Sequence, residues 1–288
     1  MTAVLALRHT SERTASDPTP APGISVRGLT LGYRAEPIVR ELDVEIPGGQ
    51  VTAIIGPNGC GKSTLLRGLG RLLPARAGEV RLGGRGVTAY GSKELAKVLG
   101  LLPQSPVVPE GVRVRELVER GRHPYRGMFS RWSAQDEHAV TEALEQTDTA
   151  GLADALVDEL SGGQRQRVWI AMVLAQNTRV LLLDEPTSFL DLAHQVEVLD
   201  LVRSLNRTRG TTVVMVLHDL GMAARYADHV IGMSRGRVVA VGDPVQVVTP
   251  QTVREVFGID CRVITDPGTG TPVVLPGSGQ PQENGERR

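Results

Sequence analysis

Long apolar runs are missing from this chain of 288 residues. The longest unbroken run, residues 168–175, is far shorter than the ~20 residues that a helix needs to cross a bilayer. The N-terminus has no cationic segment ahead of a proper apolar region, so no secretory signal is expected. The sequence therefore predicts a chain that neither spans a membrane nor is secreted.

Cysteine is also scarce, since Cys60 and Cys261 are the only two. Cys60 lies inside a glycine-rich segment, where a disulfide would restrain a loop that must wrap a ligand. We therefore expect reduced thiols and a cytosolic setting.

Net charge is absent as well, because 32 basic residues balance 32 acidic ones. This balance argues against a nucleic-acid-binding protein that relies on an overall basic field, although a local basic patch would escape such a count. The length suits one large α/β domain with additions.

Strand-like and helix-like segments alternate from residue 25 to about 245. This alternation predicts an α/β fold with a mostly parallel sheet flanked by helices. Apolar runs at 51–55, 180–184 and 212–217 predict buried parallel strands.

The region between residues 106 and 160 has a different character. Apolar residues take helical spacing at 112–123 and again at 136–156, which predicts an inserted helical subdomain. Ser133 and Asp136 form a candidate capping box at the start of its second helix.

The two ends of the chain are expected to lie outside this domain. Residues 1–24 are interpreted as a disordered tail. Residues 246–288 are interpreted as a separate extension, in which Gly268, Thr269 and Gly270 join two apolar runs into a small hairpin before a disordered tail.

A glycine-rich segment follows the strand predicted at 51–55 and leads into a helix-like run. Glycines let backbone N–H groups approach phosphate oxygens, and the helix N-terminus adds positive potential. We expect Lys62 to neutralise the β and γ phosphates, Ser63 to ligate Mg²⁺ and Thr64 to support the loop. A turn without a ligand is the alternative, which this context disfavours. The predicted loop consists of Gly56, Pro57, Asn58, Gly59, Cys60, Gly61, Lys62, Ser63 and Thr64.

Two adjacent acids, Asp184 and Glu185, end the strand predicted at 180–184. They should lie at the carboxyl edge of the sheet, where open α/β folds bind ligands. Asp184 is the expected partner of Mg²⁺, and Glu185 is placed to polarise the water that attacks the γ-phosphorus. The alternative is a pair of solvated acids at a strand end.

A second anion-binding pattern, LSGGQ at residues 160–164, precedes an amphipathic helix. Ser161, Gly162, Gly163 and Gln164 offer a hydroxyl and backbone N–H groups at a helix start, without a lysine. Together with the glycine-rich loop and the two acids, this segment resembles the signature of the ATP-binding cassette (ABC) family, over about residues 25–245. A simple helix start is the alternative.

The resemblance implies a P-loop ATPase core with an antiparallel β subdomain. It also implies a head-to-tail homodimer, in which each ATP lies between the glycine-rich loop of one copy and the LSGGQ segment of the other.

Four further residues match positions of the ABC family. Tyr33 resembles the aromatic residue that stacks on adenine, and Gln104 resembles the glutamine that reaches the metal and the attacking water. Asp191 resembles the aspartate that contacts the opposite subunit, and His218 resembles the histidine that bonds the γ-phosphate. Each residue also has a simpler interpretation. Tyr33 could be a packing residue and Gln104 a surface amide. Asp191 could be an acid that begins a helix, and His218 a structural histidine.

A single cassette without a fused membrane segment favours a separate importer subunit. The stretches ERGRHPY (119–125) and MFSRW (128–132), with the motifs above, resemble the ferric-siderophore importer ATPases, and haem and vitamin B12 importers share much of this pattern. The resemblance implies ATP and Mg²⁺ as cofactors. The implied partners are transmembrane permease subunits and, through them, a substrate-binding protein, with no nucleic acid.

The implied location is peripheral, at the cytoplasmic face of the cell membrane. The chief alternative from another class is a soluble ABC ATPase that acts on nucleic acid or ribosomes. A third hypothesis is a regulatory module that does not hydrolyse ATP.

Overall fold

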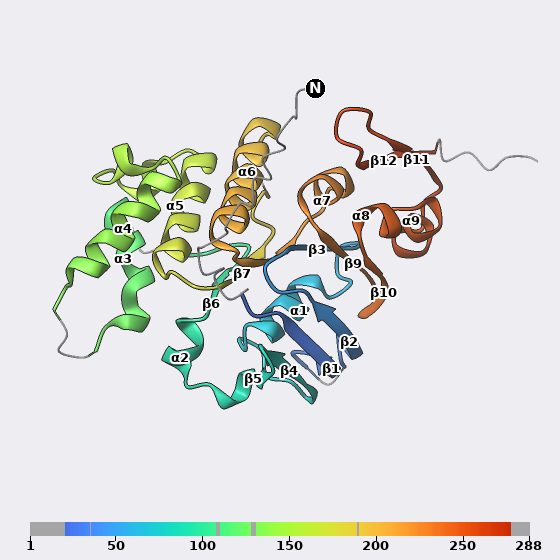
Figure 1. Cartoon of the computed structure of the whole chain (residues 1–288), viewed down its shortest axis with the longest axis horizontal. Coiled ribbons are helices and arrows are strands. Elements are labelled where there is room, and N and C mark those ends of the chain that lie inside the picture. Colours follow the sequence, from blue (N-terminus) through green and yellow to red (C-terminus); the bar gives the residue numbers. More distant parts are fainter. Residues whose placement is uncertain (1–20, 35, 108–109, 128–130, 189, 278–288) are drawn as a thin grey trace, which may run out of the picture.

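The computed structural model describes residues 21–34, 36–107, 110–127, 131–188 and 190–277. A six-stranded sheet of order β10-β9-β3-β8-β7-β6 runs through the centre of the molecule, with helices on its faces (Figure 1). Neighbouring strands are parallel except β10, which is antiparallel to β9. The strands are β3 (Val51–Ile55), β6 (Leu99–Leu102), β7 (Val180–Asp184), β8 (Thr212–Val216), β9 (His229–Ser234) and β10 (Arg237–Gly242).

The three predicted buried strands are confirmed as β3, β7 and β8, although β8 ends one residue early, at Val216. Every residue of these strands is buried, because helices or a second sheet cover both faces. Ala53 and Ile55 belong to one apolar core, and Ile54 between them belongs to the other. This alternation follows from the two-residue period of a strand.

A smaller antiparallel sheet of order β2-β1-β4-β5 packs over helix α1 (Lys62–Leu69). Leu65, Leu66 and Leu69 of α1 are buried in the core that this sheet shares with the central sheet. Its strands are β1 (Ile24–Leu31), β2 (Val39–Ile46), β4 (Ala77–Leu82) and β5 (Arg85–Gly86). Strand β1 therefore begins at the last residue of the predicted tail, and the tail residues 1–20 lie outside the described part of the chain.

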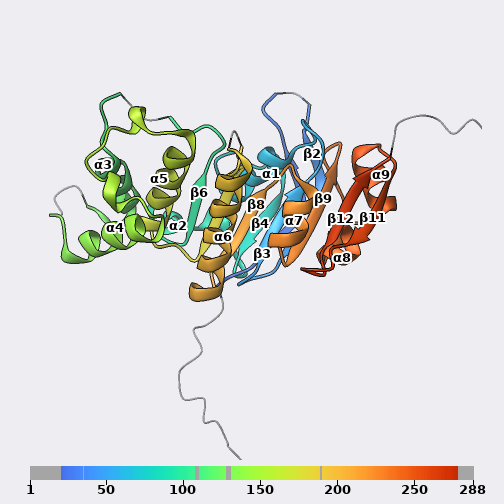
Figure 2. The ribbon, with the colours of Figure 1, turned by 90° about the horizontal axis from the view of Figure 1, so that it is seen from above.

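The inserted region lies at one end of the molecule in both views (Figures 1 and 2). Its helices are α3 (Val114–Glu119) and α4 (Ala134–Gln146), and helix α5 (Gly162–Ala175), which follows the predicted insert, packs against both. The predicted capping box of α4 is confirmed, since Ser133 Oγ accepts from the N–H of Asp136 at 3.1 Å and Asp136 Oδ2 accepts from the N–H of Ser133 at 3.2 Å.

Both predicted helices of the insert were too long. After Glu119 the chain tightens into a 3₁₀ segment, Arg120–Tyr125, which contains Pro124, a residue that cannot donate an α-helical hydrogen bond. Helix α4 ends at Gln146 because Asp148 takes a left-handed φ of 52°. Short 3₁₀ turns, Ala150–Leu152 and Val157–Glu159, follow where helical spacing had predicted a continuing helix.

A buried ion pair joins the parts of this insert. Arg122 Nε lies 2.8 Å from Asp136 Oδ1, and the two side chains are 2% and 8% exposed. A terminal nitrogen of Arg122 also donates to the carbonyl of Ala175 at 2.8 Å. The guanidinium thus connects the start of α4 to the end of α5.

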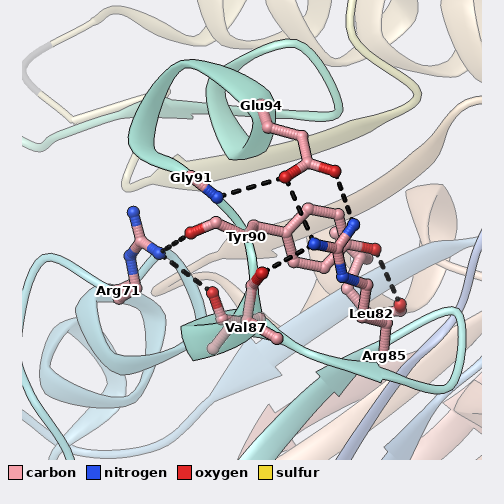
Figure 3. Close-up of polar contacts among 8 residues, drawn as sticks. Arg71, Leu82, Arg85, Val87, Tyr90, Gly91 and Glu94 are labelled. Atoms are coloured by element: carbon pink, nitrogen blue, oxygen red, sulfur yellow. Dashed lines mark hydrogen bonds and ion pairs between the residues drawn. The ribbon is translucent and has the colours of Figure 1, made fainter.

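A polar cluster secures helix α2 (Ser92–Ala96) beside the antiparallel sheet (Figure 3). Arg71, just after α1, donates to the carbonyls of Val87 at 3.1 Å and Tyr90 at 2.5 Å. Arg85 pairs with Glu94 of α2 at 2.5 Å and stacks on the ring of Tyr90. Val87 begins a 3₁₀ turn, Val87–Ala89. This cluster fixes the position of the segment that leads into β6 and from there to Gln104.

The opposite end of the molecule carries the C-terminal segment (Figures 1 and 2). Strands β11 (Cys261–Thr265) and β12 (Pro272–Pro276) form the predicted hairpin. The predicted boundary at residue 245 falls inside α8, and Val253 and Val256 of α9 are buried, so the extension packs onto the domain. The predicted final tail begins at Gly277, whose N–H donates to the carbonyl of Asp260 at 2.8 Å, and its other residues, 278–288, lie outside the described residues. The remaining helices are α6 (Leu192–Arg209), α7 (Leu220–Tyr226), α8 (Pro244–Val247) and α9 (Pro250–Phe257).

Candidate functional site

The glycine-rich segment forms a tight loop between β3 and α1. Gly56, Gly59 and Gly61 have φ angles of 152°, 76° and 107°, which L-residues with a side chain rarely adopt. A Cβ at Gly56 would lie 2.2 Å from the carbonyl oxygen of Met233. The loop therefore requires glycine for both its conformation and its close approach to β9.

Lys62 is held inside this loop. Its side chain is nearly buried, at 5% exposure, and Nζ donates to the carbonyls of Gly56 at 2.8 Å and Pro57 at 3.0 Å. Cys60 is also buried, and its burial raises the pKa of the thiol. Cys60 thus packs beneath the loop, whereas Lys62 brings a positive charge to the cavity above it.

Ser63 and Asp184 meet at the carboxyl edge of the central sheet. Ser63 Oγ donates to Asp184 Oδ1 at 2.7 Å, and Asp184 is only 2% exposed. Burial raises the pKa of Asp184 above its usual value, while the hydrogen bond from Ser63 opposes that effect. A desolvated carboxylate of this kind is one that a cation would stabilise.

Glu185 receives three side chains from three segments. Gln104 Nε2 donates to Oε2 at 2.5 Å, and Ser188 Oγ donates to the same oxygen at 2.8 Å. His218 Nε2 lies 2.6 Å from Oε1, and the Glu185 side chain is 10% exposed. Glu185 also has a left-handed φ of 52°, an uncommon conformation for a residue with a side chain. The carboxylate is therefore held firmly at the end of β7.

These side chains surround one open cavity of about 420 Å³. Ile38, which the sequence did not suggest, contributes an apolar wall. The cavity is lined by Ile38, Asn58, Gly59, Gly61, Lys62, Ser63, Thr64, Gln104, Glu185 and His218.

Tyr33 is not among the residues that line this cavity. Its side chain is exposed, and its hydroxyl accepts from Arg67 Nη1 at 2.9 Å. The adenine-stacking role predicted for Tyr33 stays a prediction.

The signature residues also lie outside that cavity. Ser161 caps α5, since its Oγ accepts from the N–H of Gln164 at 3.3 Å and the Gln164 side chain accepts from the N–H of Ser161 at 3.1 Å. Gly162 follows at the first position of the helix. The four residues of the pattern thus form a second helix start, apart from the glycine-rich loop of the same chain.

Asp191 caps α6 and lies outside the cavity as well. Asp191 Oδ1 accepts from the N–H of His194 at 3.0 Å, and this bond lowers the pKa of Asp191. Asp191 thus begins α6, and its predicted contact with the opposite subunit stays a prediction. Its carboxylate remains partly exposed beside Leu192, a leucine with 67% exposure. The contact of His194 with Asp191 was missed in the sequence.

The donor set at the cavity suits a hard cation such as Mg²⁺. Ser63 offers a hydroxyl, Asp184 a carboxylate and Gln104 an amide oxygen, and oxygen ligands are those that Mg²⁺ prefers. Within the described residues, no group of three or more histidine, cysteine, aspartate or glutamate side chains could hold a metal ion.

Comparison with known proteins gives a consistent result. The family model described as ABC transporter matches residues 39–188. The chain is 51% identical over 261 residues to the achromobactin transport ATP-binding protein CbrD of Dickeya dadantii (strain 3937), covering 90% of this chain and 97% of that protein. It is 52% identical over 248 residues to the ferric enterobactin transport ATP-binding protein FepC of Escherichia coli (strain K12), covering 86% and 92%.

A solved dimeric structure of MJ0796, a bacterial ABC transporter cassette, has the same fold. Its TM-score is 0.68 at 30% sequence identity, over 76% of this chain and 98% of that one.

Proposed function

This chain belongs to the ABC transporter family, and on that premise we propose that it is the ATP-hydrolysing subunit of an importer for iron–siderophore complexes. The observation that carries the proposal is the division of the chain into two half-sites. Lys62, Ser63 and Glu185 line one cavity, whereas Ser161 lies at a separate helix start. Each half needs a second copy to form a whole ATP site.

The cargo follows from the relatives. Two proteins named for transport of achromobactin and of ferric enterobactin are 51% and 52% identical to this chain. Since the cargo passes through other subunits, no side chain of this chain is expected to contact it. The cargo class therefore rests on relatedness alone.

ATP would bind with its phosphates on the glycine-rich loop. Backbone N–H groups of the loop and the start of α1 would hold the phosphate oxygens, with the charge of Lys62 against the β and γ phosphates. Ser63, Asp184 and Gln104 would hold Mg²⁺, which neutralises phosphate charge when bound. Gln104 and Ser188 keep the Glu185 carboxylate oriented, so that Glu185 can accept a proton from the attacking water.

Two copies would close over two ATP molecules. Ser161 and the N–H groups at the start of α5 offer an anion site without a lysine, and the γ-phosphate of an ATP on the other copy would be the anion that it binds. Exchange of the same surfaces between two copies is a two-fold arrangement. The exposed Leu192, beside Asp191, is an apolar contact available to that interface.

Permease subunits would dock where Gln104 leaves β6. A groove of about 350 Å³ lies between the end of α1, α2 and β6, and Leu72 on its edge is 64% exposed. Val107, in the loop after Gln104, is 91% exposed. In the part of the chain that the structure describes, every helix is too short or too polar to cross a bilayer. Such permeases would hold the chain at the cytoplasmic face of the membrane. They would also connect it to a substrate-binding protein.

Transport in a purified system tests this function. The chain is copurified in detergent with its membrane partners and reconstituted into vesicles that take up radioactive iron as siderophore, haem or free salt. Uptake of the iron–siderophore that requires ATP, and that fails with Glu185→Gln, is expected. ATP hydrolysis without membrane partners, together with salt-sensitive binding of RNA or DNA, would instead favour a soluble ATPase.

A further inference from the structure

His194 joins two surfaces that the sequence presents as separate motifs. Its Nδ1 atom lies 2.7 Å from Asp191 Oδ1, and its backbone N–H donates to the same oxygen at 3.0 Å. Because a carboxylate only accepts hydrogen bonds, Nδ1 must carry the proton of the ring. The ring orientation is therefore set by Asp191.

The other side of this ring covers the start of α5. A Cβ built on Gly163 would lie 2.6 Å from His194 Cδ2, 2.9 Å from Cγ and 3.0 Å from Nε2. The neighbouring glycine differs, since a Cβ on Gly162 would meet no atom within 4 Å. Within one subunit, a side chain at position 163 would therefore displace the ring of His194, whereas one at position 162 would not.

We propose that His194 is a positioning residue that holds Asp191 and the Ser161–Gly163 helix start as one surface, which binds the ATP-loaded face of the second copy. This inference rests on the function proposed above and adds the side chain that aligns the two halves of that surface. It assigns no contact between His194 and nucleotide.

The geometry explains why a ring is suited to this task. Asp191 begins α6 and Gly163 lies in the first turn of α5, so no backbone hydrogen bond of either helix relates the two. The imidazole spans them, with one edge bonded to the carboxylate and the other against a glycine. Its side chain remains 36% exposed, which places it at the rim of the surface and not in the core.

Two substitutions of His194 separate its contacts. His194→Ala removes both the ring and the bond to Asp191, whereas His194→Asn can keep a donor near Asp191 without the ring. Neither removes the backbone N–H that caps α6, so unfolding should change little. His138→Ala is the matched control, since His138 is an exposed histidine on α4.

The measurements are ATP affinity of the monomer, thermal unfolding and ATP-driven dimerisation in the Glu185→Gln background. For His194→Ala we expect unchanged monomer affinity and a dimer weakened about 5- to 100-fold, as for loss of one or two net hydrogen bonds. His194→Asn should fall between His194→Ala and the parent, and His138→Ala should match the parent. A merely structural histidine would lower the unfolding temperature without a selective effect on dimerisation.

A second pair of variants tests the contact with Gly163. Alanine is a better helix former than glycine, so Gly163→Ala should leave α5 folded while displacing the ring from Asp191. If the ring mediates part of this effect, the double variant Gly163→Ala/His194→Ala should lose less dimer affinity than the sum of the two single losses. Gly162→Ala, which meets no ring, should instead add its own effect to that of His194→Ala.

These experiments distinguish a failure of the proposed function from a failure of the positioning role of His194. If the parent protein binds ATP but never dimerises, the function proposed above fails before His194 is tested. If the parent dimerises and His194→Ala dimerises equally well, or if the effects of Gly163→Ala and His194→Ala simply add, the positioning role of His194 is wrong.

Discussion

Glu185 Oε1 lies 2.6 Å from Nε2 of His218, so the expected general base and the expected γ-phosphate ligand are paired with each other across the cavity. Both side chains line the space that a γ-phosphate would enter. A phosphate that bonds His218 would have to draw its Nε2 away from Glu185. Nucleotide binding would then leave a carboxylate oxygen open to water.

The first prediction concerns Glu185→Gln. The amide keeps the size of the side chain but cannot accept a proton from water as a carboxylate does. Hydrolysis should slow about 10²- to 10⁴-fold, the usual range for loss of a general base, while ATP affinity stays near normal and a closed dimer accumulates. Single-turnover ATPase assays and size-exclusion chromatography measure these outcomes. Near-normal turnover would remove Glu185 from this role.

Lys62→Ala tests the glycine-rich loop. Loss of one charge-assisted contact with phosphate should weaken ATP binding about 10- to 150-fold, as measured by calorimetry or by fluorescent ATP titration. Lys93→Ala provides the control, because Lys93 is an exposed lysine whose Nζ donates to the carbonyl of Arg126. Equal ATP affinity in the two variants would contradict the assignment of the loop.

Asp184→Asn should stabilise the nucleotide-free protein while abolishing Mg²⁺-dependent hydrolysis. Burial raises the pKa of Asp184 in the folded state, so the folded protein holds this proton more tightly than the unfolded chain does. The group therefore contributes stability at low pH, and that contribution is lost as the pH rises through the folded-state pKa. At neutral pH the carboxylate is a net cost that asparagine removes.

Thermal unfolding across a pH series checks this result. Each ~1 kcal/mol gained corresponds to a rise of about 2–4 °C in Tm for a domain of this size. The advantage of the variant should be largest near neutral pH and should shrink as the pH falls. A variant that is less stable than the parent at neutral pH would contradict the account of Asp184.

The buried pair of Arg122 and Asp136 gives a prediction about stability. Arg122→Met would leave the Asp136 carboxylate buried without its cation and should cost about 3–5 kcal/mol in free energy of unfolding. Adding Asp136→Asn should recover part of this loss. Urea unfolding measures both, with Arg115→Met as the control, because its partly exposed pair with Glu137 should contribute at most about 1 kcal/mol. Equal losses for Arg122→Met and Arg115→Met would contradict the importance of the buried pair.

The sequence predicted the central sheet well because the strands that build it are short apolar runs buried on both faces, as in β7. It also predicted that Lys62 and Glu185 meet at the cavity, although it did not suggest Ile38. Lys62 and Glu185 follow strands β3 and β7, which share one sheet, and parallel strands present their carboxyl ends at one edge.

The ends of helices in the insert were not predictable by periodicity. Apolar residues keep helical spacing past Gln146, but the left-handed backbone at Asp148 ends α4. The spacing of apolar residues does not reveal such a backbone conformation. The contact of His194 with Gly163 depends on how α5 and α6 pack. Residues far apart in sequence carry no local pattern that reveals a contact of this kind, although a histidine three residues after Asp191 was a visible candidate for its cap.

The central claim, that the glycine-rich loop of one copy faces Ser161 of the other across ATP, is tested most directly by crosslinking between copies. Asn58→Cys and Ser161→Cys are placed on separately tagged chains that also carry Cys60→Ser, Cys261→Ser and Glu185→Gln, and the mixture is treated with a short bismaleimide. A crosslinked pair of differently tagged chains that forms with Mg-ATP, and not with ADP or without nucleotide, is the predicted result. Chains that bind ATP yet never crosslink between these two positions would contradict the account.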